Sequence, residues 1–262
     1  MILASPGSVA FEILGISIYW YGVFMALAIF AGVTVAQWAY KAYFSNKNID
    51  LLENIFPWLV ICGILGARLY YCILNHSYYF SNPLQILNIR EGGLSIHGMF
   101  IACLIFLITY SKRNKINLFT LTAPMCLGVA IAQSIGRWGN FFNSEAFGKP
   151  YDGLIKLYIP QYLRPECYKN VTYFHPTFLY ESVLDFLIFI ILLILLKKNV
   201  KNPLFITSIY FLMYSVVRIF VENLRIDSVS FVFGLPIAMV VSLLILAISV
   251  FGIIISLKSK KS

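Results

Sequence analysis

The sequence predicts an all-α integral membrane protein with seven transmembrane helices, and three observations carry that prediction. Of its 262 residues, 60% are hydrophobic and only 12% are charged, whereas an ordinary soluble domain is about 45–50% apolar and about 25% charged. Seven apolar runs have the length of a membrane span, and basic residues gather in alternate segments between them. The composition excludes a soluble globular enzyme, a disordered chain and a nucleic-acid-binding module.

The expected spans are close in length to the roughly 20 residues that cross a hydrocarbon core about 30 Å thick. They are Ile18–Tyr40, Ile55–Leu74, Leu94–Tyr110, Leu118–Ile135, Phe178–Leu196, Leu204–Val221 and Phe231–Leu257. No cleaved signal peptide is expected, because Met1–Phe11 lacks a basic opening segment. Four of the five cysteines lie in apolar runs, so no disulfide framework is predicted.

Basic residues assign the two sides of the membrane, because cytoplasmic loops carry an excess of lysine and arginine. Eleven of the 20 such residues follow the first, third, fifth and seventh spans: Lys41, Lys47, Lys112, Arg113, Lys115, Lys197, Lys198, Lys201, Lys258, Lys260 and Lys261. This alternation predicts an amino terminus outside the cell and a carboxyl terminus in the cytoplasm. The net charge of +9 therefore marks cytoplasmic loops and does not indicate a nucleic acid partner.

The longest polar segment, Gly136–His175, falls between the fourth and fifth spans on the outer side. It is long for a loop without structure of its own. We therefore expect a small folded extracytoplasmic cap, inserted in a single membrane domain that covers residues 1–262.

Polar residues within the spans are costly and usually functional, and here they lie at the outer ends of six spans. Arg218, Glu222 and Arg225 share one helical face by their spacing. The others are Tyr21, Arg68, His97, Arg137, Asn140, His175, Glu181 and Asp185. Concentration at one depth favours a site for a molecule of the outer leaflet over a path across the membrane.

Several arginines at this depth suit an anionic phospholipid headgroup, because guanidinium binds phosphate in a planar fork. A histidine among them is a candidate base near neutral pH. The sequence shows no metal-ligand spacing, no glycine-rich phosphate loop and no Gly-x-Ser-x-Gly elbow. It therefore predicts an enzyme with no metal, no cofactor and no covalent intermediate.

Plainer interpretations of the same residues stay open. Glu181 and Glu222 could only neutralise arginines and fix helix packing, and Arg225 could be an ordinary interfacial charge. Arg68 and Arg218 could extend to lipid headgroups. His97, taken alone, would be a structural histidine.

Six short motifs resemble those of the prolipoprotein diacylglyceryl transferase family, in the same order along nearly the whole chain. They are Trp20–Gly22, Gly66–Arg68, Gly92–Gly98, Gly136–Gly148, His175–Glu181 and Arg218–Glu222. The fourth is long and specific. Ala67 and Ser144 stand where the family often has glycine.

The resemblance implies a reaction. The family moves an sn-1,2-diacylglyceryl group from phosphatidylglycerol to the lipobox cysteine thiol of a bacterial prolipoprotein, which forms a thioether and releases glycerol 1-phosphate. It also implies a multi-pass protein of the bacterial cytoplasmic (inner) membrane, with its active site facing the outer leaflet and without a cofactor.

The resemblance also implies roles for single residues. His97 is the candidate base, with a thiol activated mainly by arginines as the alternative. Arg137 and Arg218 would bind the phosphate, with Arg68 and Arg225 as second choices. The expected supporting residues are Asn140, Asn143 and Tyr21 for headgroup or ester oxygens, Glu145, Glu181 and Glu222 for orienting arginines, and Gly148 for a close backbone approach.

Two other classes compete with this interpretation. A lipid transporter or flippase would also need about seven spans and buried charges, but the chain has no inverted repeat and its polar groups are one-sided. An intramembrane protease would need a Ser/His pair or paired aspartates, and only Ser95 and His97 are available.

Overall fold

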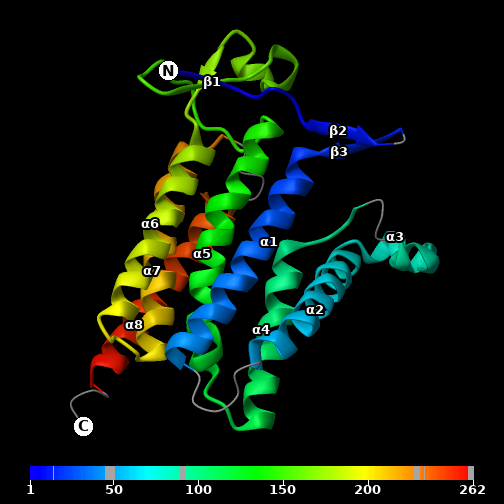
Figure 1. The fold of residues 1–262 in the computed structure, drawn as a ribbon. Helices are drawn as coiled ribbons and strands as arrows, with labels where there is room; N and C mark the ends of the chain where they lie inside the picture. Colours follow the sequence, from blue (N-terminus) through cyan, green and yellow to red (C-terminus); the bar gives the residue numbers. More distant parts are fainter. Residues whose placement is uncertain (14, 45–50, 89–91, 227–230, 233, 259–262) are drawn as a thin grey trace. The chain divides into compact units, whose positions relative to one another are not determined.

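The computed structural model describes residues 1–13, 15–44, 51–88, 92–226, 231–232 and 234–258. These residues are mostly helical, with short strands near the amino terminus, in the segment between α5 and α6, and before α8 (Figure 1). The chain forms two compact units. The first comprises residues 1–39 and 123–262, and the second comprises residues 40–122.

Long helices carry all the expected spans. They are α1 (Trp20–Ala39), α2 (Leu51–Leu74), α4 (Ile96–Asn114), α5 (Leu118–Phe142), α6 (Thr177–Lys197), α7 (Pro203–Leu224) and α8 (Ile237–Lys258). The shorter helices are η1 (Tyr40–Phe44), α3 (His76–Ser81), η2 (Pro83–Leu87), η3 (Gln161–Leu163) and η4 (Glu166–Tyr168). The strands are β1 (Ile2–Ala4), β2 (Val9–Ile13), β3 (Ile16–Tyr19), β4 (Lys156–Tyr158), β5 (Tyr173–Phe174), β6 (Phe231–Val232) and β7 (Leu235–Pro236).

Six of these helices, in the part of the chain that the structure describes, are long and apolar enough to cross a membrane. The exception is α4, which has 19 residues and ends in the polar sequence Lys112-Arg113-Asn114. The third expected span is therefore a helix, but it is not among these six.

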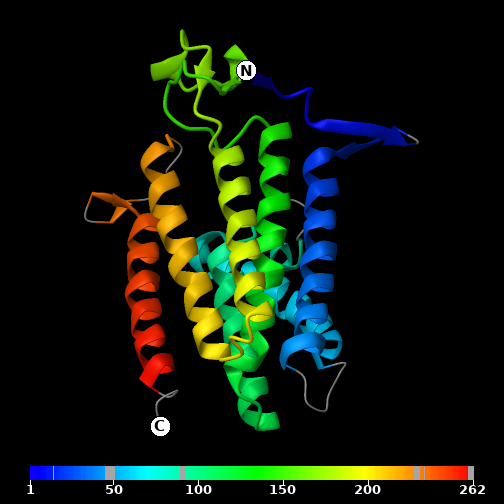
Figure 2. The same ribbon diagram turned by 60° about the vertical axis from the view of Figure 1, so that its left-hand side comes forward.

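The helix α8 shows the inverted burial that distinguishes a membrane helix from a soluble one. Its buried residues are Ser242, Ser249 and Ser256, whereas Ile248 and Phe251 are 70% and 65% exposed. In lipid, small residues let helices approach closely and large apolar residues face the acyl chains. The serine face packs on α7, where Gly252 lies against Ser208, and α6, α7 and α8 run side by side (Figure 2).

Three expected boundaries are wrong, each because local apolar character does not define a helix end. The first span begins at Trp20, since Ile18 belongs to β3, which pairs with β2 in a hairpin. The last span begins at Ile237, after a second hairpin of β6 and β7. The expected cap begins too early, because residues 136–142 continue α5 to Phe142.

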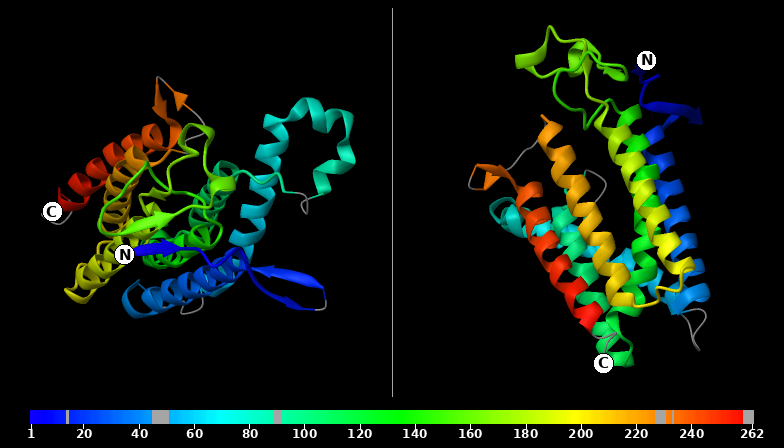
Figure 3. Two further views of the ribbon diagram at one scale, coloured as in Figure 1. Left: turned by 90° about the horizontal axis from the view of Figure 1, so that it is seen from above. Right: turned by 90° about the vertical axis from the view of Figure 1, so that its left-hand side faces the viewer.

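The cap is a small sheet with its own hydrophobic core. The strand β1 pairs with β4 in parallel, and β5 pairs with β4 on the other side. Figure 3 shows β1 beside the chain of the cap from above. The core packs Leu157, Ile159 and Phe174 of the cap against Phe141 of α5 and Phe178 of α6. The cap is therefore fixed to the carboxyl-terminal end of α5 and the amino-terminal end of α6. It also includes the start of the chain, which the sequence does not predict.

Within the second unit, α2 and α4 cross at glycines. A Cβ atom at Gly98 would lie 2.3 Å from the carbonyl oxygen of Gly66 and 2.3 Å from the Cβ of Tyr70. A Cβ atom at Gly66 would lie 2.2 Å from the Cβ of Ala102. Only residues without side chains allow this approach, and the contact fixes the first turn of α4 against α2.

This crossing predicts that Gly98→Ala destabilises the protein. Overpacking a close helix contact costs about 1–3 kcal/mol, so we expect the thermal midpoint in detergent to fall by several degrees. Gly22→Ala in α1 is the matched control, because a Cβ atom at Gly22 would meet nothing within 4 Å. Equal midpoints for the two variants would contradict the close crossing.

Candidate active site

A buried carboxylate, Glu181, holds arginines from three segments of the first unit. Glu181 lies in the second turn of α6 and its side chain is 4% exposed. It pairs with Nε of Arg137 from α5, with Nη1 of Arg218 from α7 at 3.1 Å, and with Nη1 of Arg225 at 3.8 Å. We call Arg137, Arg218, Arg225, Glu181 and Glu222 the arginine cluster.

The second carboxylate of the arginine cluster extends it along α7. Arg218 Nη2 lies 2.8 Å from Glu222 Oε2, one helical turn away. Arg225 follows directly after the last residue of α7. Glu181 and Glu222 therefore both contact arginines, and the expectation that they orient these arginines stays a prediction.

The arginine cluster carries a net charge of +1 when its members are ionised, because three guanidinium groups face two carboxylates. The arginine side chains keep 15–21% of their surface exposed, whereas both glutamates are almost completely buried. Each guanidinium has five N–H donors, and the ion pair of Arg137 with Glu181 uses its Nε. The arginine cluster can therefore still offer forked donors to an anion.

Asp185 lies one turn deeper on α6 and is 1% exposed. Neither of its carboxyl oxygens accepts a hydrogen bond from the described residues. The sequence places Asp185 among the polar residues at the ends of the spans but predicts no role for it. Nearby, Ser134 and Ser182 each donate to the other's carbonyl oxygen at 2.8 Å and tie α5 to α6.

The last turn of α5 and the residues that follow it bring three of the predicted residues together. Asn140 and Asn143 both donate to Oε1 of Glu145, at 2.9 and 3.4 Å. The partners of Glu145 among the described residues are therefore amides, whereas the sequence predicts that it orients an arginine. Ser144 and Ala146 on either side have φ values of 53° and 55°. This left-handed backbone explains why glycine suits the position of Ser144.

Gly148 lies at a close approach of the backbone to neighbouring segments, as expected from the sequence. A Cβ atom there would lie 2.8 Å from the Cβ of His175 and 2.9 Å from the carbonyl oxygen of Leu224. Its own N–H donates to the carbonyl oxygen of His175 at 3.0 Å. The turn thus passes between the start of α6 and the end of α7, beside Arg225, with which Gly148 forms a β-bridge.

Tyr21 lies in the first turn of α1, and its ring packs against Gly139 of α5. A Cβ atom at Gly139 would lie 3.0 Å from Cδ2 of Tyr21. Gly139 stands between Arg137 and Asn140 in the sequence, so Tyr21 packs against the same end of α5.

His175 lies directly before α6, in the motif that contains Glu181, and the sequence predicts no role for it. Its ring stacks on Tyr151 with centroids 3.9 Å apart, and Nδ1 lies 3.3 Å from the hydroxyl of Tyr180. Burial lowers the pKa of His175, and the charge of Lys149 lowers it further. Both effects favour the neutral ring.

The second unit holds the two remaining predicted residues, Arg68 and His97. His97 lies in the first turn of α4, 6.4 Å from the ring of Tyr70 between centroids. Arg68 lies in α2 and is 5% exposed. Its guanidinium contacts five backbone carbonyls of the segment that precedes α4. This arrangement disagrees with the prediction that Arg68 binds phosphate, because all five N–H donors of its guanidinium already contact these carbonyls.

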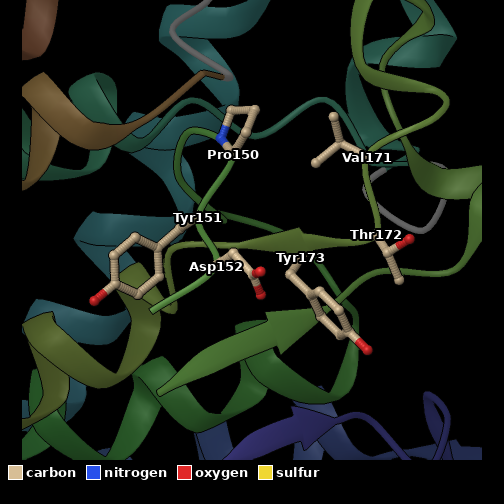
Figure 4. Close-up of a pocket in the computed structure, with 6 residues that line it drawn as sticks. All are labelled: Pro150, Tyr151, Asp152, Val171, Thr172 and Tyr173. Carbon is tan, nitrogen blue, oxygen red and sulfur yellow. The ribbon is translucent and has the colours of Figure 1, made fainter. Parts of the chain in front are cut away.

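A shallow hollow in the cap lies beside His175, because Tyr151 lines it, but it does not include the arginine cluster. Two facing segments line it, residues 150–152 and 171–173 (Figure 4). The segments are joined by the hydrogen bond from the Tyr151 N–H to the Tyr173 carbonyl oxygen at 3.0 Å. None of the lining residues belongs to the arginine cluster, so we assign the hollow no part in the site. Groups of three or more metal-ligating side chains are absent from the residues that the structure describes.

The fold and the arginine cluster define a polytopic α-helical membrane protein with a buried cationic site. Residues 8–255 match the protein family described as prolipoprotein diacylglyceryl transferase. The chain belongs to this family.

Single relatives are similar to this chain over nearly its full length. A protein of Synechocystis sp. named phosphatidylglycerol–prolipoprotein diacylglyceryl transferase is 40% identical over 95% of this chain and 89% of its own length. Proteins of the same name from Clostridium novyi and Synechococcus elongatus are 40% and 39% identical, over 96% and 95% of this chain and 95% and 87% of their own lengths.

The arginine cluster predicts that Glu181→Gln is more destabilising than Glu145→Gln. Removing one partner of a buried ion pair costs about 3–5 kcal/mol, and Glu181 pairs with three arginines. Glu145 is exposed and contacts only amides among the described residues. Thermal midpoints of the two purified variants measure the difference, and equal values would show that Glu181 does not hold the arginine cluster together.

Proposed function

We propose that this chain transfers the sn-1,2-diacylglyceryl group of phosphatidylglycerol to the lipobox cysteine thiol of bacterial prolipoproteins. Its family membership and the names of its relatives support this reaction. The structural observation that carries the proposal is the arginine cluster around Glu181. No cofactor is required by the chemistry.

In the proposed reaction, a cysteine thiolate attacks the glycerol carbon that bears the phosphate. A carbon–sulfur bond forms, the carbon–oxygen bond to the phosphate breaks, and the leaving glycerol 1-phosphate keeps the electron pair. The phosphate thus changes from a diester with one negative charge to a monoester with two. Guanidinium groups aimed at this developing charge stabilise the transition state.

Arg137 and Arg218 are the proposed phosphate ligands, because each keeps donors beyond those that contact glutamate. Arg225 is a third candidate at the same carboxylate. Asn140, Asn143 and Tyr21 are proposed to contact headgroup or ester oxygens. Glu181 and Glu222 hold the arginines in orientation, and Gly148 allows the turn to approach Arg225.

His97 is the proposed base that takes the thiol proton. Its position in the first turn of α4 and its place in the motif Gly92–Gly98 support this role. Activation of the thiol by the arginines alone is the alternative.

The proposed topology has seven spans, with α4 as the third. The amino terminus and the cap face outside, and the carboxyl terminus lies in the cytoplasm. The distribution of lysine and arginine supports this orientation. The protein is then a multi-pass protein of the bacterial cytoplasmic membrane whose site faces the outer leaflet.

A reconstituted assay tests the proposed function directly. Purified protein, phosphatidylglycerol and a lipobox peptide should yield a thioether-linked diacylglyceryl peptide, measured by mass spectrometry. Arg137→Lys should lower the rate by about 10²–10³-fold, the typical cost of removing one oxyanion donor, since lysine keeps the charge but lacks the fork. Arg113→Lys is the matched control.

Two outcomes of that assay would contradict parts of the proposal. Lipid movement without a thioether product would support a flippase and contradict the proposed function. Near-normal turnover by Arg137→Lys would show that charge alone suffices at this position.

The base role of His97 predicts a defect that depends on pH. His97→Gln should lower the rate at pH 7 by about 10²–10⁴-fold, the usual contribution of general base catalysis. The defect should shrink towards pH 9, because a free thiol with a pKa of about 8.5 then ionises without help. His76→Gln, at an exposed histidine, is the control. A rate ratio independent of pH would leave the arginines as the activators of the thiol.

A further inference from the structure

The guanidinium of Arg68 is completely occupied by backbone carbonyls. Its Nε donates to Ile86 at 2.9 Å. Its Nη1 donates to Gly92 and Gly93 at 2.8 and 3.0 Å, and its Nη2 donates to Gln85 and Asn88 at 2.5 and 2.8 Å. A guanidinium carries five N–H donors, so all of them are used. A phosphate could be bound only if these carbonyls lost their partner.

The surrounding chain is shaped to receive this side chain. Gly93 has a φ of 74°, and a Cβ atom there would lie 2.4 Å from Nη1 of Arg68. Gly92 has a φ of 91°. The guanidinium also lies over the ring of Tyr79, 5.2 Å from its centroid. The two glycines let the backbone turn its carbonyl oxygens towards Arg68.

Further contacts between α2 and the start of α4 lie on either side of His97 in the sequence. The N–H of Ser95 donates to the carbonyl oxygen of Ala67 at 3.0 Å, next to Arg68 on α2. Ser95 is the N-cap residue of α4, which means that it directly precedes the first helical residue, Ile96. Gly98 then lies against the carbonyl of Gly66. The first turn of α4 is therefore held to α2 on both sides of His97.

We propose that Arg68 is a positioning residue for His97 and does not bind the substrate. It clamps the carbonyls of Gln85, Ile86, Asn88, Gly92 and Gly93 onto α2 and thereby fixes the start of α4, which carries His97. This inference rests on the proposed base role of His97. Lysine cannot replace Arg68, because an ammonium has three donors against five and would leave at least two of the carbonyls without a partner.

A double-mutant cycle tests the proposal through kinetics. Arg68→Lys should lower kcat at least tenfold with KM for phosphatidylglycerol within twofold, because small misplacements of a catalytic group cost up to about 10²-fold. On a His97→Gln background, the same change should cost less than threefold, because the group that it positions is already gone. The control Arg113→Lys should change neither constant.

Hydrogen exchange supplies a readout that does not depend on activity. Arg68→Lys should speed exchange of the Ser95 amide at least tenfold and leave the amides of α7 unchanged. If Arg68→Lys does not fold, Tyr79→Leu enters the same cycle, because it removes the ring beside the guanidinium and keeps the hydrogen bonds. Its kcat defect should be smaller and should also vanish on the His97→Gln background.

Two results would overturn the proposal. A raised KM for phosphatidylglycerol, with an undiminished cost on the His97→Gln background, would make Arg68 a substrate ligand. Unchanged exchange at Ser95 would show that Arg68 does not hold the start of α4. A wild-type protein that makes no thioether would instead contradict the proposed function, and the exchange measurement would still decide whether the clamp exists.

Discussion

The site depends on one buried carboxylate that holds three guanidinium groups. Glu181 is almost completely buried, and it forms ion pairs with one arginine of α5, one of α7 and the residue that follows α7. A charge at this depth is costly unless it is paired, so the arrangement of α5, α6 and α7 and the position of the arginines are mutually dependent. The pairing leaves an excess of positive charge and further N–H donors on Arg137, which is the property that a phosphate leaving group requires.

Close helix packing makes this arrangement possible, and small residues supply it. In the first unit, a Cβ atom at Gly128 of α5 would lie 2.2 Å from the carbonyl oxygen of Gly32 of α1. Ser134 and Ser182 add interhelical hydrogen bonds between α5 and α6. In lipid, close contacts and polar pairs of this kind hold helices together, because the acyl chains are as apolar as leucine.

The sequence predicts the helices and the shared face of Arg218, Glu222 and Arg225, because both follow from short-range rules. Apolar runs identify the helices, and the spacing of the three residues places them on one face. The contacts of Glu181 with Arg137 and Arg218 join residues that are far apart in the sequence, and the expectation that Glu181 orients arginines does not name these partners.

Other features depend on contacts between distant residues and cannot be read from local patterns. The strand β1 pairs with β4 across more than 150 residues, and Glu145 takes amide partners set by the left-handed backbone at Ser144 and Ala146. The sequence predicts Arg68 as a phosphate ligand because its depth and charge match those of the other arginines. The groups that accept hydrogen bonds from Arg68 are backbone carbonyls. Every residue has such a carbonyl, so no residue type in the sequence marks them.

A structure of the protein with phosphatidylglycerol bound would show whether the arginine cluster binds the phosphate. We expect the phosphate oxygens to lie within hydrogen-bond distance of the guanidinium groups of Arg137 and Arg218, while Glu181 keeps its contacts with both. A phosphate bound elsewhere, with these two arginines contacting only carboxylates, would contradict it.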